Sequence, residues 1–236
     1  MAKRRKSKEG FTERLLNLIS EPQFIKFENI LSEPNFFKIV GRTHYERWHS
    51  CFLGWLLDSC GSHLLSEYTL LRFLLLLLDE KCLKSKNHSN QRLFKILPTV
   101  AFSDIEVFPN ENISKETSIT GIGRFDIFIS AKYKGINDCE GTLNCIVELK
   151  IDTTPNKKQS KKYADWLFKN HENDENLLVY LTPYLLDNSK NTIGDDRWYC
   201  IDYQLLNDKF LLPLVEHPNL KETTCLKKNM INSLII

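Results

Sequence analysis

The chain has 236 residues, of which 42% are hydrophobic and 26% charged, and its formal net charge is +2. This composition predicts a globular protein with a sizeable core, and it excludes a polycation that binds nucleic acid through bulk charge. The seven cysteines contain no Cys-x-x-Cys pair, which excludes a zinc knuckle and favours a reducing, cytoplasmic compartment. The run LLRFLLLLLDE is too short to span a bilayer and carries Arg72, so we expect a buried helix and no membrane segment.

The first hundred residues have the apolar spacing of helices. The expected helices cover residues 11–20, 24–40, 44–58 and 66–83. In the third helix, one apolar stripe contains Tyr45, Trp48, Phe52, Trp55 and Leu56. We assign residues 1–44 to an N-terminal helical extension and residues 45–236 to the main domain.

From about residue 100 the apolar residues follow the shorter period of strands. The expected strands cover residues 101–108, 114–120, 124–133, 144–151, 176–183 and 197–203. A helix between the fourth and fifth strands begins with Thr154 as its cap and Pro155 in its first turn, and another covers residues 204–217. The core order of helix, three strands, helix and strand predicts an α/β fold with helices packed against a sheet.

Two of the apolar strands carry charges. Asp126 lies in RFDIFI, and Glu148 and Lys150 lie in CIVELKI, two residues apart and therefore on the same face of the strand. If the two strands pair, Asp126 lies beside Glu148, and two adjacent carboxylates need a shared cation, a shared proton or a nearby positive charge. The alternative is a solvated Glu–Lys ion pair, which is common on strands.

The helix that follows these strands adds a second polar group. Gln159 and Tyr163 are four residues apart and share the face that we expect to contact the sheet, while Lys158 and Lys162 lie to one side. Packing with ordinary hydrogen bonds is the alternative interpretation for the Gln–Tyr pair.

In this order, Asp, Glu-x-Lys and Gln-x-x-x-Tyr resemble the PD-(D/E)XK nuclease superfamily, and the last motif resembles its RecB-like branch. The segment ERWHSCFLGWLLDSCGSHLL resembles the opening helix of an uncharacterised bacterial group of the superfamily. The resemblance implies a restriction-endonuclease-like αβββαβ core with a mixed central sheet flanked by helices. Phe125 precedes Asp126 where the superfamily name has a proline.

The resemblance also implies roles for individual residues. Asp126, Glu148 and the Leu149 carbonyl would bind Mg²⁺ or Mn²⁺, with Glu46 approaching the metal, and Lys150 would orient or activate the attacking water. Gln159 and Tyr163 would contact the substrate. Glu46 has an alternative role at the edge of the core, together with His49.

Further residues are weaker candidates. Arg124 and the lysines of PNKKQSKK, including Lys158 and Lys162, are placed to contact phosphates, although a solvated helix face is the alternative for any single lysine. Glu106 and Glu116 are candidates for supporting the metal ligands. His63 matches the GSH turn of the group, but its role is open.

We therefore expect a Mg²⁺- or Mn²⁺-dependent nuclease that hydrolyses phosphodiester bonds, with DNA as the favoured substrate and bacterial anti-phage defence or DNA repair as its role. One alternative is a nucleic-acid-binding module that has lost catalysis. Another is a protein-interaction subunit of a larger assembly. A homo-oligomer or a complex with a partner protein is compatible with each of these.

Overall fold

The computed structural model describes residues 10–25, 45–86, 91–109, 123–136, 139–151, 156–185 and 193–221. The expected strand at 114–120, most of the expected helix at 24–40, Glu116 and Cys225 lie outside these ranges. The boundary between residues 44 and 45 also falls at the edge of a range that is not described, so the two-part division stays a prediction.

Five strands form one mixed sheet in the order β1-β2-β3-β4-β5. The strands are β1 Ala101–Pro109, β2 Ile127–Lys134, β3 Glu140–Leu149, β4 Glu175–Thr182 and β5 Trp198–Asp202. β1, β2 and β3 pair antiparallel, whereas β3, β4 and β5 pair parallel. The carboxyl ends of β3, β4 and β5 therefore meet at one edge, and this confirms the α/β fold with a mixed central sheet.

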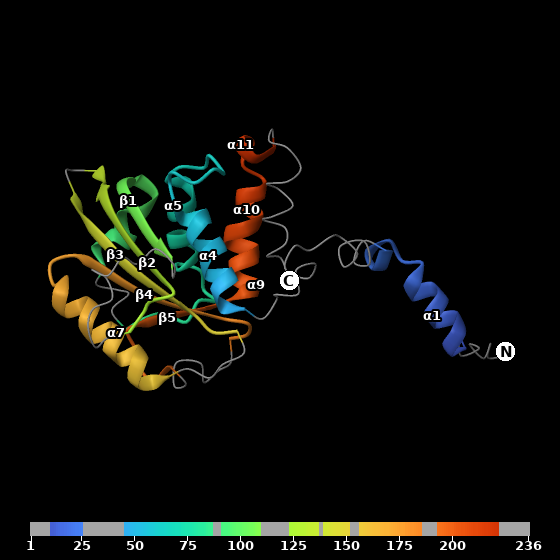
Figure 1. The fold of residues 1–236 in the computed structure, drawn as a ribbon. Coiled ribbons are helices and arrows are strands. Elements are labelled where there is room, and N and C mark those ends of the chain that lie inside the picture. Colours follow the sequence, from blue (N-terminus) through green and yellow to red (C-terminus); the bar gives the residue numbers. More distant parts are fainter. Residues whose placement is uncertain are drawn as a thin grey trace, which may run out of the picture.

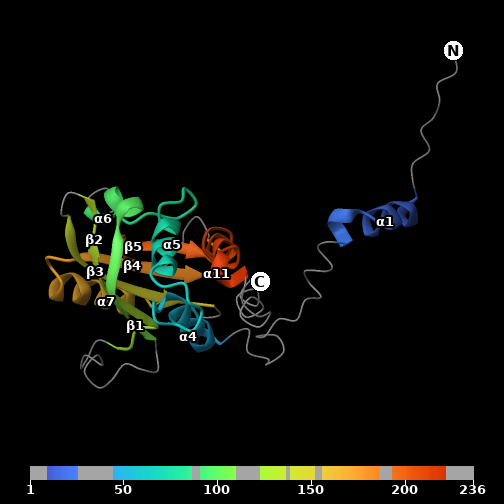
Figure 2. The ribbon, with the colours of Figure 1, turned by 90° about the horizontal axis from the view of Figure 1, so that it is seen from above.

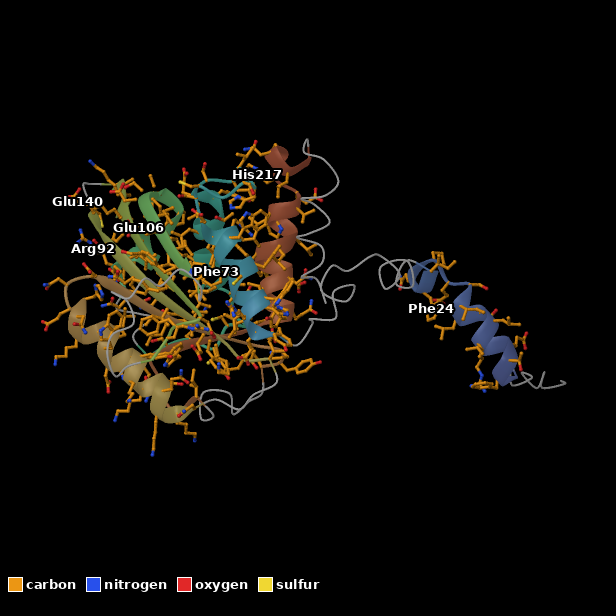
Figure 3. The ribbon with its side chains drawn as sticks, in the orientation of Figure 1. Phe24, Phe73, Arg92, Glu106, Glu140 and His217 are labelled. Carbon is orange, nitrogen blue, oxygen red and sulfur yellow. The ribbon has the colours of Figure 1, made fainter. Side chains whose placement is uncertain are left out.

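Helices cover both faces of the sheet (Figures 1 and 2). One face packs against α4 Glu46–Leu57, α5 Tyr68–Leu76 and the helical run that follows β5, and the side chains between these layers form the larger core. Phe73 of α5, labelled in Figure 3, lies in this layer with its ring 5.7 Å from that of Phe210. The other face packs against α7 Lys157–Asn170, with Ile146, Leu178 and Trp198 beneath it.

The helical run after β5 contains a π-helical segment. It consists of α9 Tyr203–Leu206, the π-helix η4 Asn207–Leu211 and α10 Leu212–Val215, followed by α11 Pro218–Lys221. Pro213 has no N–H to donate to the carbonyl of Lys209, four residues earlier. The Arg72 side chain donates to that carbonyl instead, at 2.9 Å. The expected helix at 204–217 is confirmed. Arg72 of the leucine-rich helix supplies a hydrogen bond to the Lys209 carbonyl in the irregular turn of this helix.

The buried face of α4 differs from the aromatic stripe seen in the sequence. The buried residues of α4 are His49, Ser50, Leu53, Gly54, Leu56 and Leu57. Of the expected stripe, Leu56 is fully buried, but Tyr45 and Trp48 are exposed, and Phe52 and Trp55 only flank the core. The leucines and glycine allow closer packing: a Cβ on Gly54 would lie 2.9 Å from the Pro109 side chain at the end of β1.

The structure corrects the start of α7. Its cap is Asn156, whose side-chain oxygen accepts hydrogen bonds from the N–H groups of Lys158 and Gln159, and the helix begins at Lys157. The cap expected at Thr154 is therefore wrong. Asn is as good a cap as Thr, and its amide oxygen satisfies two N–H groups of the first turn that the helix leaves unpaired.

His63 has a structural role in the turn between α4 and α5. The imidazole is fully buried, its Nδ1 accepts from the N–H of Leu65 at 3.0 Å, and its Nε2 lies 3.1 Å from the carbonyl of Trp55. Because Nδ1 accepts, the single ring proton is on Nε2, which donates to that carbonyl. The neutral ring thus ties the end of α4 to the turn that follows it.

The remaining described elements are α6 Arg92–Ile96, the short 3-10 helix η2 Leu97–Thr99 and α1 Phe11–Ile19. None of the residues of α1 is buried, and this helix stands apart from the other described elements in Figures 1 and 2. Within the described part of the chain, no helix is long and apolar enough to cross a membrane. The six cysteines there are all free thiols.

Candidate active site at the carboxyl edge of the sheet

Asp126 and Glu148 come together at the end of the β2–β3 pair. Ile127 pairs with Val147 in the antiparallel register, so Asp126, the residue before β2, stands opposite Glu148. The Asp126 carboxylate accepts a hydrogen bond from the N–H of Leu149 at 2.8 Å. A side chain thereby continues the hydrogen bonding of the two strands by one step and fixes the carboxylate against the end of β3. In Figure 3, Glu140 marks the opposite end of this strand.

The ammonium of Lys150 lies between the acidic groups. Its Nζ is 2.8 Å from Glu148 Oε1 and 4.0 Å from Asp126 Oδ2, and it donates to the Leu149 carbonyl at 2.9 Å. The expected proximity of Glu148 and Lys150 on one side of the strand is confirmed. Lys150 is only 14% exposed, so these contacts are shielded from solvent.

Glu46 joins the group from the other side of the sheet. It is the first residue of α4, and its carboxylate accepts from the N–H of Ile151 at 3.1 Å and lies 3.4 Å from Lys150 Nζ. Although the two residues are 104 positions apart, the first turn of α4 brings Glu46 to the end of β3. We refer to Glu46, Asp126, Glu148 and Lys150 as the edge cluster.

The edge cluster contains more negative than positive charge. Burial and the nearby charge of Asp126 raise the pKa of Glu148 to about 7, although Lys150 opposes this shift. Burial also raises the pKa of Asp126, although the Leu149 N–H and Lys150 oppose this. Burial lowers the pKa of Lys150, but the three carboxylates outweigh this effect and the net pKa is raised. Three carboxylates around one ammonium favour a further cation or a proton.

The donor atoms of the edge cluster suit a hard divalent ion. The Oε2 atom of Glu148 is buried and has no hydrogen-bond partner within the described ranges of the chain, which is costly unless another group satisfies it. Among the described residues, no three His, Cys, Asp or Glu side chains are grouped closely enough to hold a metal by themselves. Mg²⁺ needs fewer protein ligands, because it binds through one or two carboxylates and completes its shell with waters and phosphate. Asp126, Glu148 and the Leu149 carbonyl fit this requirement.

Tyr163 and Gln159 of α7 form a hydrogen-bonded pair beside the edge cluster. The Gln159 amide donates to the Tyr163 hydroxyl at 2.5 Å, and the hydroxyl donates to the carbonyl of Arg124 at 2.7 Å. Tyr163 is fully buried, whereas Gln159 is half-buried. Burial raises the pKa of Tyr163 to about 12, with Glu148 as the next cause, so the hydroxyl keeps its proton at neutral pH.

The basic side chains expected around the site are exposed. Arg124 lies two residues before Asp126, and its charge lowers the pKa of that carboxyl. Lys158 and Lys162 are exposed on α7, one helical turn apart. Glu106, labelled in Figure 3, is exposed on β1, where it pairs with Ser130 of β2, and no contact described for it involves the edge cluster.

The structure adds a tyrosine that the sequence did not single out. Tyr203 follows the carboxyl end of β5, and its hydroxyl forms a 3.0 Å hydrogen bond with Nδ1 of the buried His49, one turn after Glu46 on α4. Burial raises the pKa of Tyr203, and the charges of Glu46 and Asp126 contribute. The sequence offered one signal for this contact. Tyr203 comes directly after a parallel strand, at the edge where ligands bind in open α/β sheets.

A family model described as the PD-(D/E)XK nuclease superfamily matches residues 34–228. No curated protein and no solved structure matches the chain. The matched region contains the whole sheet, the helices on both its faces and the edge cluster. With most of the chain matched, and with a five-stranded mixed sheet that carries Asp126, Glu148 and Lys150 at one edge, the chain belongs to the PD-(D/E)XK nuclease superfamily.

Proposed function

We propose that this protein is a Mg²⁺- or Mn²⁺-dependent nuclease that hydrolyses phosphodiester bonds at the edge cluster. The observation that carries the proposal is the buried Oε2 of Glu148, which lacks a partner in the part of the chain that the structure describes, although Asp126, Lys150 and Glu46 surround its carboxylate. A purely structural ion pair would satisfy its buried acceptors, because an unpaired one costs stability. An acceptor left open in a cluster of excess negative charge is suited to bind a cation.

Asp126, Glu148 and the Leu149 carbonyl would hold the ion, and Glu46 would assist from α4. When bound, a divalent ion supplies Lewis-acid stabilisation of the charge on the phosphate. Asp126 and Glu46 would hold the ion from two directions, because Asp126 is fixed to β3 by the Leu149 N–H and Glu46 is fixed by the Ile151 N–H.

Lys150 would act on the attacking water and on the phosphate. Its pKa is raised by the carboxylates around it, so the side chain is an ammonium at neutral pH and donates hydrogen bonds rather than removing a proton. In the hydrolysis, the oxygen of a water molecule loses a proton and forms a bond to phosphorus, while the bond from phosphorus to one sugar oxygen breaks and that oxygen gains a proton, so that the protons balance through solvent. Lys150 would orient this water and stabilise the charge that develops on the phosphate oxygens.

The substrate backbone would lie along the exposed basic side chains. Arg124, Lys158 and Lys162 are exposed near the edge or along α7, and Gln159 offers an amide between them and the edge cluster. Such contacts to phosphates give affinity without reading the base sequence. We therefore propose nucleic acid as the substrate, with DNA favoured.

The pairing of Gln159 with Tyr163 on α7 supports placement in the RecB-like branch. By the same resemblance we propose a cytoplasmic role in bacterial anti-phage defence or DNA repair, alone, as a homo-oligomer or with a partner protein.

A cleavage assay tests the proposal. The wild-type protein and Asp126→Asn are incubated with plasmid, single-stranded DNA and RNA in Mg²⁺, Mn²⁺ or EDTA. We expect cleavage that needs the metal and is lost in the variant. Asp104→Asn is the matched control, because Asp104 pairs with Lys132 at 2.8 Å on an exposed part of the sheet and has a positive φ that Asn tolerates.

Metal-dependent cleavage that persists in Asp126→Asn would refute the assignment. Binding of nucleic acid without cleavage of any substrate would instead favour the catalytically silent binding module.

A further inference from the structure

Tyr163 of α7 is buried against the segment that leads into β2. Its ring is fully buried and contacts the ring of Phe125 edge-on, with the centroids 4.7 Å apart. Its hydroxyl is used twice, as acceptor from Gln159 and as donor to the Arg124 carbonyl. A nucleic acid could reach this hydroxyl only by breaking these contacts.

The segment 123–125 is shaped to fit Tyr163. Gly123 has a φ of +115°, which side-chain-bearing residues rarely adopt, and a Cβ at this position would lie 3.1 Å from the Tyr163 hydroxyl. Phe125 also packs against Trp166, one turn further along α7, with ring centroids 5.2 Å apart. Close approach, a hydrogen bond and aromatic packing therefore all hold the same three residues against α7.

Asp126 is the next residue, and it is held at both ends. Its carboxylate is fixed by the Leu149 N–H at 2.8 Å, and the backbone that enters it is fixed by Tyr163 through the Arg124 carbonyl at 2.7 Å. A shift of segment 123–125 would move the Cα of Asp126 and change the direction of its carboxylate toward Glu148. Small displacements of a ligand group weaken the binding of an ion.

We propose that Tyr163 is a positioning residue for the metal carboxylate: it holds segment 123–125 and through it Asp126, and only Gln159 of the pair faces the substrate. This inference rests on the proposed function, in which Asp126 binds a divalent ion. It gives Tyr163 a different role from the substrate contact that the resemblance implies.

Three binding and stability measurements on the full chain test the inference. Tyr163→Phe keeps the ring and removes the two hydrogen bonds of the hydroxyl. We expect its affinity for Mn²⁺, measured by calorimetry, to fall about three- to tenfold, the loss typical of one or two hydrogen bonds. Its affinity for single-stranded and duplex DNA in EDTA should stay within about twofold of the wild type.

Tyr199→Phe is the matched control. Tyr199 is also fully buried, and its hydroxyl donates to Gln91 at 2.7 Å, but its side chain lies in the core on the opposite face of the sheet. We expect both variants to lower the melting temperature, and only Tyr163→Phe to weaken Mn²⁺ binding. Gly123→Ala perturbs the same contact from the other side, so its effect on Mn²⁺ affinity should not add to that of Tyr163→Phe.

Two results would overturn the inference. Weaker DNA binding in EDTA with unchanged Mn²⁺ affinity would make Tyr163 a substrate contact. Equal Mn²⁺ affinity in Tyr163→Phe, Tyr199→Phe and the wild type would reduce it to a packing residue. Asp126→Asn, measured alongside, separates this failure from that of the proposed function, because unchanged Mn²⁺ affinity in Asp126→Asn would refute both.

Discussion

The middle and the carboxyl end of β3 bury polar side chains in different ways. Asn144 and Glu148 are four residues apart on the same face of the strand, and both are at most 5% exposed. The Asn144 amide donates to Asp174 at 2.9 Å and accepts from Ser130 at 3.2 Å, so both of its polar atoms are paired. Glu148 shares Lys150 with two other carboxylates, and no described residue pairs with its Oε2. The middle of the strand thus pairs neutral donors with acceptors, while the carboxyl end holds an excess of acceptors.

This difference distinguishes polar groups that are buried for stability from polar groups that are buried for function. A buried group whose partners are all present contributes to stability, and its loss leaves those partners unpaired. A buried group that is short of partners costs stability, and proteins retain such groups at sites that bind something else. Substitutions at these two positions of β3 should therefore have opposite effects on stability and on metal binding.

The largest expected effect is that of Lys150→Ala on cleavage. We expect the rate to fall about 10²–10³-fold, because the ammonium that stabilises developing charge is lost. Mn²⁺ affinity should be retained or increased, since the variant removes the positive charge that lies between the carboxylates. Single-turnover cleavage and calorimetry measure the two effects. Lys132→Ala, at an exposed ion pair, should change neither.

The second effect is the destabilisation caused by Asn144→Leu. Leucine has a similar size but leaves the Ser130 hydroxyl and one hydrogen bond of Asp174 without a partner, so we expect a loss of about 2 kcal/mol in the free energy of unfolding. Mn²⁺ affinity should not change. Urea denaturation and calorimetry of the same preparation would show this, and a stability equal to the wild type would remove the contrast between Asn144 and Glu148.

The third effect is a pH dependence of stability that arises from Glu148. Its pKa is about 7 in the folded protein and near 4.5 in the unfolded chain, so the folded state holds the proton more tightly. The stabilisation from this proton is fully present below about pH 4.5 and is lost as the pH rises through 7. The difference in unfolding free energy between wild type and Glu148→Gln should change by about 1–2 kcal/mol across this range. A constant difference from pH 4.5 to 8.5 would contradict the assigned shift.

The smallest effect is that of Glu46→Gln. Glutamine can still accept from the Ile151 N–H, so the first turn of α4 should stay in place, while the charge near Lys150 is lost. We expect Mn²⁺ affinity to fall by no more than about fivefold, as for a partly exposed charge. A loss as large as that of Asp126→Asn would make Glu46 an equal metal ligand.

Much of the fold could be predicted from the sequence because periodicity and pairing are local. The strands of RFDIFI and CIVELKI and the helix of KKQSKKYADWLFKN were expected, and alternation along β3 was enough to place Glu148 beside Lys150. The family match over residues 34–228 agrees with this core.

The parts that could not be predicted depend on contacts between distant residues. His49 and Tyr203 are 154 positions apart, and no pattern near either residue indicates the other. The aromatic part of the α4 stripe was misleading, although its Leu56 is buried, because leucines on the neighbouring face pack more closely, which hydrophobic spacing does not reveal. The face of α7 that carries Tyr163 could be predicted. The hydrogen bond from its hydroxyl to the Arg124 carbonyl depends on how segment 123–125 folds.

The most direct test of the account is calorimetric titration of Mn²⁺ into the wild type and Glu148→Gln. The glutamine keeps the size of the side chain and removes the charge that burial disfavours, so the variant should be folded and at least as stable as the wild type above pH 7. We predict that the wild type binds Mn²⁺ and that Glu148→Gln binds it at least about 100-fold more weakly. Equal binding by the two proteins would contradict a metal site at the carboxyl edge of the sheet.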